Sequence, residues 1–159
     1  MIAPLTDVLY VFFCSMLPII ELRGSIILGA GLGLPWWLNL IVSIIGNMIP
    51  VPFILIFIRR ILHWMANTKI PLFSKIARWV ENKAHKNSKK ITRYATFGLT
   101  IFVAIPLPGT GAWTGALVAA ILDMRIKNAL PSIFLGVVCA AIIMTLASYG
   151  FVGFLSFLI

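Results

Sequence analysis

Two charged residues lie inside a long apolar stretch near the start of the chain. Glu21 and Arg23 occur in the sequence PIIELRG at residues 18–24, within the otherwise apolar residues 8–34. A charged side chain at the centre of a bilayer costs about 2.5–3.5 kcal/mol on insertion scales, and such residues usually line a cavity or a transport pathway. Residues two apart do not share a helix face. A turn of the chain at this point would let both side chains reach one pocket.

The chemistry of Glu21 has two interpretations. Burial and a neighbouring arginine shift the pKa of a carboxylate in opposite directions, and a balance between them lets the group exchange a proton. Glu21 is therefore the expected proton-coupling residue of a transport cycle. The alternative is a static ion pair with Arg23 that holds the turn.

A second unusual sequence, PLPGTG at residues 106–111, interrupts another apolar stretch. Two prolines and two glycines within six residues cannot continue an α-helix. A helix that restarts near Ala112 would point its N-terminus at this turn, and helix N-termini and glycine-rich loops favour anions. A purely structural tight turn is the alternative. The predicted substrate-binding residues are Arg23, Gly109, Thr110, Gly111, Trp113 and Thr114.

The composition identifies an integral membrane protein. The 159 residues are 61% hydrophobic and 11% charged, whereas a soluble domain has about 45–50% apolar and about 25% charged residues. The net charge of +9 does not indicate nucleic acid, because ten of the thirteen Lys and Arg lie within residues 59–93, beside an apolar segment. Basic side chains in that position meet anionic lipid headgroups. We expect residues 1–159 to form a single membrane domain.

Four apolar segments, residues 8–34, 36–58, 97–122 and 128–159, each have the ~20 residues that a membrane-spanning helix needs. The first and third are interrupted at their centres by the residues predicted to break a helix, Pro18, Gly24, Pro106 and Pro108. Irregular backbone at membrane depth is tolerated only inside protein or beside water. Each half-segment is about 15–18 Å long, half the hydrocarbon thickness. We therefore predict two re-entrant helical hairpins.

The second and fourth segments are predicted to be transmembrane helices. The second is expected to bend near Pro50. The fourth is expected to span to about Tyr149 and to continue as a short, separate C-terminal extension.

Charge predicts the orientation. The positive-inside rule places the basic loop of residues 59–96 in the cytoplasm, and a re-entrant third segment brings Arg125 and Lys127 to the same side. Within residues 72–83, apolar side chains recur at helical spacing and charged side chains lie between them. This pattern predicts an amphipathic helix on the cytoplasmic surface.

The predicted fold class is therefore an all-α integral membrane protein of the cytoplasmic membrane of a prokaryote. It contains an inverted repeat of a re-entrant hairpin plus a transmembrane helix, with the amphipathic helix between the repeats. A faint match at a spacing of 88–90 residues, such as that of residues 17–18 to 105–106, agrees with a duplication.

Several kinds of chemistry are not expected. Both histidines, His63 and His85, lie in the polar loop, so we predict no metal site and no enzyme active site in the membrane. No Walker-type loop occurs, which argues against ATP as the energy source. Cys14 and Cys139 lie in apolar segments and are expected to be small buried hydrophobes. We predict no cofactor.

The sequences ELRGSIILG at residues 21–29 and PLPGTGAWTG at residues 106–115 resemble the small multidrug export protein family, a distant relative of the DedA-like (VTT-domain) membrane proteins. The resemblance implies a fold with two re-entrant hairpins. The DedA-like relatives imply proton-linked transport of polyprenyl-phosphate carriers or scrambling of phospholipids, with an acidic residue and arginines in the hairpins. Glu21 and Arg23 match that pattern, whereas the second turn carries no charge.

The leading functional hypothesis is a proton-coupled secondary transporter of an anionic amphiphile, such as a lipid-linked phosphate, with a midplane site between the two hairpins. The alternatives are a small multidrug exporter of cationic compounds with Glu21 as the counter-charge, an energy-independent lipid scramblase, and a non-transporting membrane scaffold that interacts through residues 69–93. The expected partners are membrane lipids, the amphiphilic substrate, protons and a second copy in a two-fold homodimer.

Overall fold

A computed structural model describes residues 4–66, 88–107 and 109–158 of the chain. All secondary structure within these ranges is helical and no strand occurs in them, so the all-α prediction is confirmed. The predicted amphipathic helix at residues 72–83 and the predicted helix breaker Pro108 lie outside the described residues. The helices are α1 (Leu5–Met16), α2 (Glu21–Gly31), α3 (Trp36–Met48), α4 (Pro50–Ala66), α6 (Ser88–Ala104), α7 (Ala112–Ile121) and α8 (Ile126–Leu158).

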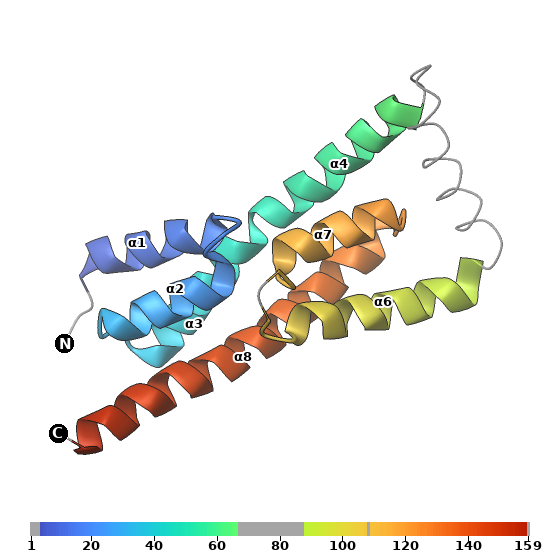
Figure 1. Ribbon diagram of the computed structural model, residues 1–159. Coiled ribbons are helices and arrows are strands. Elements are labelled where there is room, and N and C mark those ends of the chain that lie inside the picture. Colours follow the sequence, from blue (N-terminus) through green and yellow to red (C-terminus); the bar gives the residue numbers. More distant parts are fainter. Residues whose placement is uncertain (1–3, 67–87, 108, 159) are drawn as a thin grey trace.

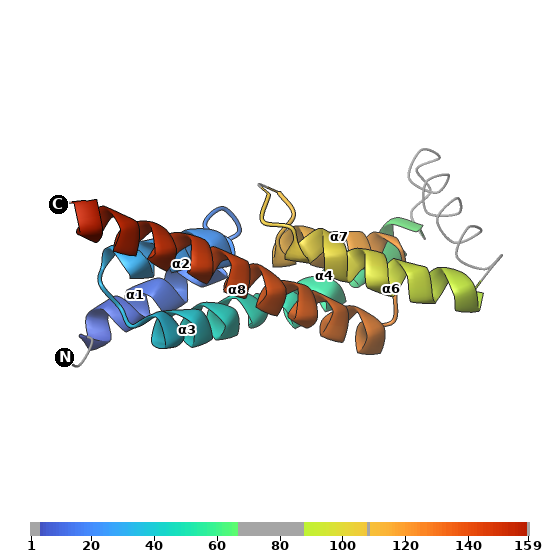
Figure 2. The same ribbon diagram turned by 90° about the horizontal axis from the view of Figure 1, so that it is seen from below.

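The helices form two halves that run in opposite directions (Figure 1). In the first half, α1 runs to the middle of the molecule, α2 returns, and α3 with α4 crosses to the far end. In the second half, α6 runs to the middle from that far end, α7 returns, and α8 crosses back. Both turns, at residues 17–20 and 105–111, therefore lie in the middle of the molecule, as the view from below also shows (Figure 2).

The two halves repeat the same backbone. The connection after α2 and the connection after α7 make identical hydrogen bonds at positions 90 residues apart. In both, a residue with positive φ, Gly33 at 74° and Asp123 at 48°, turns the chain toward the next helix. The pattern of buried and exposed residues over 21–34 recurs without a difference over 111–124. The matching backbone N–H donors are Leu32, Gly33 and Leu34 in the first half and Leu122, Asp123 and Met124 in the second.

Glycines let the helices of each half cross at close range. A Cβ at Gly46 of α3 would overlap the Ser15 hydroxyl of α1. The equivalent residue in α8, Gly136, faces α6, where a Cβ would lie 2.6 Å from Cβ of Val103 and 2.8 Å from the carbonyl oxygen of Thr100. Small residues at such crossings are typical of membrane helices, whose association depends on close packing.

The interruptions fall close to the predicted places, with one exception. Pro18 lies in the turn between α1 and α2, and Pro106 follows the end of α6. Gly24, which we expected to break the first segment, lies inside α2, so that prediction is wrong. A glycine costs a helix only about 1 kcal/mol relative to alanine, which the packing of α2 outweighs.

Two long apolar helical runs match the second and fourth segments. They cover Trp36–Ile61 and Ile126–Phe151, and each has 26 residues. At 1.5 Å per residue each is about 39 Å long, enough to cross a hydrocarbon core of about 30 Å. The first run is interrupted at Ile49, before Pro50. The second continues as one helix to Leu158, so the separate C-terminal piece that we predicted is wrong.

The outer surfaces of these helices are apolar. Phe53 and Phe57 of α4 are 69% and 65% exposed, and Leu146 of α8 is 71% exposed. Side chains of this size avoid water and suit a lipid environment.

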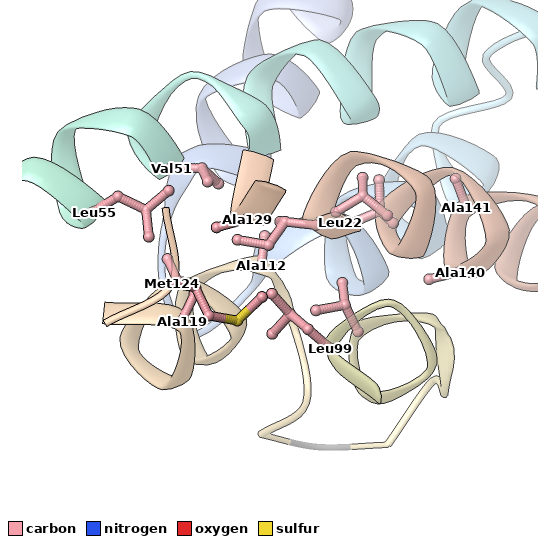
Figure 3. Close-up of a cluster of buried hydrophobic side chains, with 14 of the residues drawn as sticks. Leu22, Val51, Leu55, Leu99, Ala112, Ala119, Met124, Ala129, Ala140 and Ala141 are labelled. Atoms are coloured by element: carbon pink, nitrogen blue, oxygen red, sulfur yellow. The ribbon is translucent and has the colours of Figure 1, made fainter. Parts of the chain in front are cut away.

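The buried core belongs to both halves. Leu22, Val51 and Leu55 from the first half lie with Leu99 and Met124 from the second in one cluster of buried side chains (Figure 3). Alanines fill much of the rest of the cluster, including Ala112, Ala119, Ala129, Ala140 and Ala141. The shared core fixes the two turns against each other.

Candidate functional site

Glu21 begins α2 in a strained conformation and is only 9% exposed. Its φ of 48° lies in the left-handed region, which is uncommon for a residue other than glycine. Its N–H donates to the carbonyl oxygen of Leu17 at 2.8 Å, which closes the turn. Strain of this kind clusters at functional sites, where the surrounding structure holds it in place.

The carboxylate of Glu21 lies at the N-terminus of α7. The backbone N–H of Trp113 donates to Oε1 at 3.2 Å. Gly111 precedes α7, and a Cβ there would overlap the carboxylate of Glu21. A helix N-terminus attracts negative charge through its free N–H groups and its dipole. The anion at the N-terminus of α7 is therefore a side chain of the other half of the molecule.

Arg23 is bound to the second turn. Its Nη2 donates to the carbonyl oxygen of Ile105 at 3.0 Å and to the hydroxyl of Thr110 at 2.8 Å. The Thr110 hydroxyl in turn bonds to the carbonyl oxygens of Ile105 at 2.7 Å and Leu107 at 2.9 Å. Among the residues that the structure describes, the recorded ion pair is Arg59 with Asp123. Glu21 and Arg23 attract each other electrostatically but are not recorded as a close ion pair.

Trp113 makes the reciprocal contact. Its indole Nε1 donates to the carbonyl oxygen of Met16, the last residue of α1, at 3.2 Å. Trp113 occupies the position in α7 that Arg23 occupies in α2, and each reaches the carbonyl at or beside the end of the other half's first helix. The two turns are therefore linked in both directions.

A small cavity of about 10 Å³ lies where the halves meet. This volume admits about one water molecule. Its walls contain three pairs of equivalent residues, so it lies on the pseudo-two-fold axis that relates the halves. The polar side chains among its lining residues all come from the first half. The lining residues are Glu21, Leu22, Arg23, Asn47, Val103, Gly111, Ala112, Val137 and Ala140.

The structure brings most of the predicted site residues together. Glu21, Arg23, Thr110, Gly111 and Trp113 contact one another across the two turns. Gly109, with φ of 82°, forms the exposed part of the second turn, and Thr114 lies further along α7. Neither of them lines the cavity. Within the described ranges, no three His, Cys, Asp or Glu residues are grouped as metal ligands would be.

Asn47 is the residue that sequence reasoning left out of the site. It lies in the last turn of α3 and is 1% exposed. The available signal was an amide inside an apolar segment, because polar residues at membrane depth are costly and usually functional. What the sequence did not indicate is that α3 directs this amide toward the same cavity as Glu21.

Polar contacts also join the halves away from the cavity. Asn39 Nδ2 donates to the carbonyl oxygen of Ile26 at 2.8 Å and to the Tyr149 hydroxyl at 3.0 Å, and that hydroxyl donates to the carbonyl oxygen of Leu34 at 2.7 Å. Tyr149 belongs to α8 in the second half, and the equivalent residue in the first half is Arg59 of α4. There Nη2 of Arg59 lies 3.9 Å from Oδ1 of Asp123.

The apolar helices, their lipid-compatible surfaces and the cross-linked turns define an all-helical membrane protein with a small polar site at its centre. The chain belongs to the small multi-drug export protein family: the family model described as "Putative small multi-drug export protein" matches residues 21–143. The match begins at Glu21 and includes every residue that lines the cavity. No curated protein and no solved structure matches the chain.

Proposed function

We propose that the protein is a proton-coupled secondary exporter whose substrate site is the cavity between the two turns. The lengths of the helices support this placement. α1 has 12 residues, α2 has 11 and α7 has 10, so each covers about 15–18 Å, half of a hydrocarbon core. In this proposal α1–α2 and α6–α7 are re-entrant hairpins that enter from opposite faces of the membrane, and their turns meet at its midplane.

The single observation that carries the proposal is the contact of the Glu21 carboxylate with the N-terminus of α7. When Glu21 is ionised, the helix dipole and the Trp113 N–H attract it, and a charge-assisted hydrogen bond joins the turns. Protonation removes the charge and weakens this attraction. Proton binding at Glu21 is thereby coupled to separation of the turns.

Separation of the turns is required for transport. A cavity that admits about one water molecule cannot hold an amphiphile. In the proposed cycle the turns part toward one face and then toward the other, around a site that remains near the midplane.

The geometry favours cationic cargo. Glu21 and Arg23 both line the cavity, but Nη2 of Arg23 is already hydrogen-bonded to Ile105 and Thr110 of the second turn. A cation and a proton can each neutralise Glu21, so their competition for one carboxylate would give exchange of drug for proton. An anionic amphiphile is the second candidate, because Arg23 also lines the cavity and both of its recorded hydrogen-bond partners are neutral oxygens.

The proposed setting is the cytoplasmic membrane of a prokaryote, with residues 59–96 on the cytoplasmic side. The basic composition of that loop supports this orientation. The exposed apolar surfaces support contact with lipid and with a second copy in a homodimer.

The test is transport in reconstituted vesicles with ethidium as a fluorescent cation and an imposed pH gradient. Glu21→Gln removes the charge and keeps the size of the side chain, and we expect it to abolish proton-driven transport while the protein remains folded by circular dichroism. Asp7→Asn is the matched control, since Asp7 lies in the first turn of α1 and does not line the cavity.

Three other outcomes would point elsewhere. Unchanged transport by Glu21→Gln would remove Glu21 from the mechanism. Movement of labelled phospholipid that is indifferent to the pH gradient would identify a scramblase. Loss of function on deletion of residues 69–93, with no effect of Glu21→Gln, would identify a scaffold.

A further inference from the structure

Asn47 has a buried polar atom with no hydrogen-bond partner among the residues that the structure describes. The side chain is 1% exposed, and its Oδ1 accepts no hydrogen bond from the residues that the structure describes. A buried acceptor left unpaired costs free energy, so such groups are rare and their presence calls for a specific explanation.

Packing does not require an amide at this position. The equivalent residue in the second half is Val137, which is also 1% exposed and lines the same cavity. A valine therefore fills the same place in the repeated fold without a polar group. Asn39 lies about two turns earlier in α3 and, unlike Asn47, has its amide fully engaged. The Asn39 amide is hydrogen-bonded to Ile26, Tyr149 and Ser43.

The polar groups that face the cavity favour a ligand that donates hydrogen bonds. Both Glu21 and Asn47 line the cavity. Glu21 has a carboxylate, and Asn47 has an amide whose Oδ1 accepts no hydrogen bond from the described residues, so each offers a hydrogen-bond acceptor. Arg23 also lines the cavity, but its recorded hydrogen bonds, both from Nη2, go to Ile105 and Thr110 of the second turn. The volume of about 10 Å³ matches a group the size of one water molecule. A protonated primary amine is such a group, whereas a trimethylammonium group is larger and carries no N–H.

We infer that Asn47 and Glu21 together recognise the head group of a protonated primary amine, and that Asn47 distinguishes it from a quaternary ammonium group. This inference rests on the proposed function, because the rest of the amine can enter only when the turns separate. A site built to hydrogen-bond a ligand rejects the analogue that lacks the donor, since its buried acceptor is then left unpaired.

The experiment compares two cations of the same chain length, hexylammonium and hexyltrimethylammonium, in vesicles with an imposed pH gradient. Transport is the rate above that of protein-free vesicles, because the neutral form of hexylamine crosses a bilayer unaided. In the wild type we expect transport to prefer hexylammonium by at least about tenfold. Asn47→Val introduces the residue found at the equivalent position, and we expect it to reduce that preference to within about threefold, chiefly through slower transport of hexylammonium. Binding of both cations to protein in detergent, measured by calorimetry, should show the same change in preference.

Thr145→Val is the matched control. Thr145 is 6% exposed, and its Oγ1 is also buried with no hydrogen-bond partner in the described part of the chain, but Thr145 does not line the cavity. We expect this variant to keep the wild-type preference. If Asn47→Val does not fold, Asn47→Ser, which retains a hydroxyl acceptor, should give an intermediate preference.

The outcomes separate the two proposals. If the wild type moves neither cation in response to the pH gradient, the proposed function fails. If it moves both equally well, or if Asn47→Val keeps the full preference for hexylammonium, proton-coupled export stands and the role of Asn47 is overturned. An equal loss of preference in Thr145→Val would also overturn it, because the effect would then not be specific to the cavity.

Discussion

Glu21, Arg23 and Asn47 in the first half of the molecule correspond to Gly111, Trp113 and Val137 in the second. The first half thus supplies the charged and amide groups of the cavity. The second half supplies a helix N-terminus, an indole and the space that a missing Cβ leaves. Two carboxylates facing each other on the axis could not both ionise readily. One backbone, used twice in opposite directions, can therefore hold a single carboxylate against a helix N-terminus.

The two halves also differ in the contacts that Tyr149 and Arg59 make away from the cavity. Tyr149 joins α8 to the connection after α2 by hydrogen bonds to neutral partners, whereas Arg59 joins α4 to the connection after α7 by a long ion pair. The fold places both at equivalent positions. The two halves therefore use different chemistry for the same structural task.

The largest effect is expected where the halves meet on the axis. Gly111→Ala would place a Cβ in the space of the Glu21 carboxylate, so the carboxylate must leave Trp113. We expect loss of proton-driven ethidium transport and destabilisation by about 1–3 kcal/mol, the range for overpacking a buried site. Gly31→Ala is the control, because a Cβ at Gly31 meets no atom within 4 Å. If Gly111→Ala transports like the wild type, the contact between the Glu21 carboxylate of the first half and the α7 N-terminus of the second half is not needed for transport.

A similar effect on stability, without a selective effect on proton coupling, is expected at the helix crossings. Gly46→Ala and Gly136→Ala would each force a Cβ against the backbone of the facing helix, at 2.6 Å from Phe12 O and 2.8 Å from Thr100 O. Each should lower the free energy of unfolding by about 1–3 kcal/mol. Gly98→Ala, in open space on α6, should be neutral or stabilising by up to about 1 kcal/mol. Thermal unfolding in detergent micelles measures all three, and a large difference between Gly46→Ala and Gly136→Ala would show that the halves do not pack alike.

The smallest effects concern the contacts beyond the cavity. Tyr149→Phe removes the hydroxyl that binds Leu34 and Asn39, and we expect it to destabilise the protein by about 1–2 kcal/mol. Asp123→Asn should cost less than about 1 kcal/mol, because the ion pair is long and Asp123 is 61% exposed. Thermal unfolding in detergent micelles compares the two variants. If Asp123→Asn loses more free energy of unfolding than Tyr149→Phe, the ion pair is the stronger of the two contacts and the prediction is wrong.

Local rules predicted the boundaries of the elements well. Pro18 and Pro106 mark the turns because proline lacks an N–H and clashes with the preceding helical turn. Gly24 misled the same reasoning, because a glycine disfavours a helix far less than proline does. The basic residues before position 97 led us to begin the third segment too late in the chain. α6 begins at Ser88, since lysine and arginine are good helix formers even where they are too polar for a membrane core.

The partners within the site could not be predicted from the sequence. Glu21 and Arg23 are two residues apart, which suggested an ion pair between them. In the structure Glu21 accepts a hydrogen bond from Trp113, 92 residues away, and Arg23 donates one to Thr110, 87 residues away. Such contacts depend on how the halves pack, which no local pattern encodes. The repeat was visible only as a spacing of 88–90 residues. In the structure the equivalent residues of α1 and α6 are 88 apart and those of α2 and α7 are 90 apart, because Ala104 and Gly111 are two positions further apart than Met16 and Glu21.

The short helices α1 and α2 affect the thickness of the bilayer beside them. In the proposed arrangement this helix pair reaches only halfway across the hydrocarbon, so the acyl chains of the opposite leaflet have no protein beside them at that place and must tilt or thin to fill the volume. Because the second pair enters from the other face, each leaflet has one such depression, and the energy of deforming the lipid becomes part of the energy of every movement of the turns.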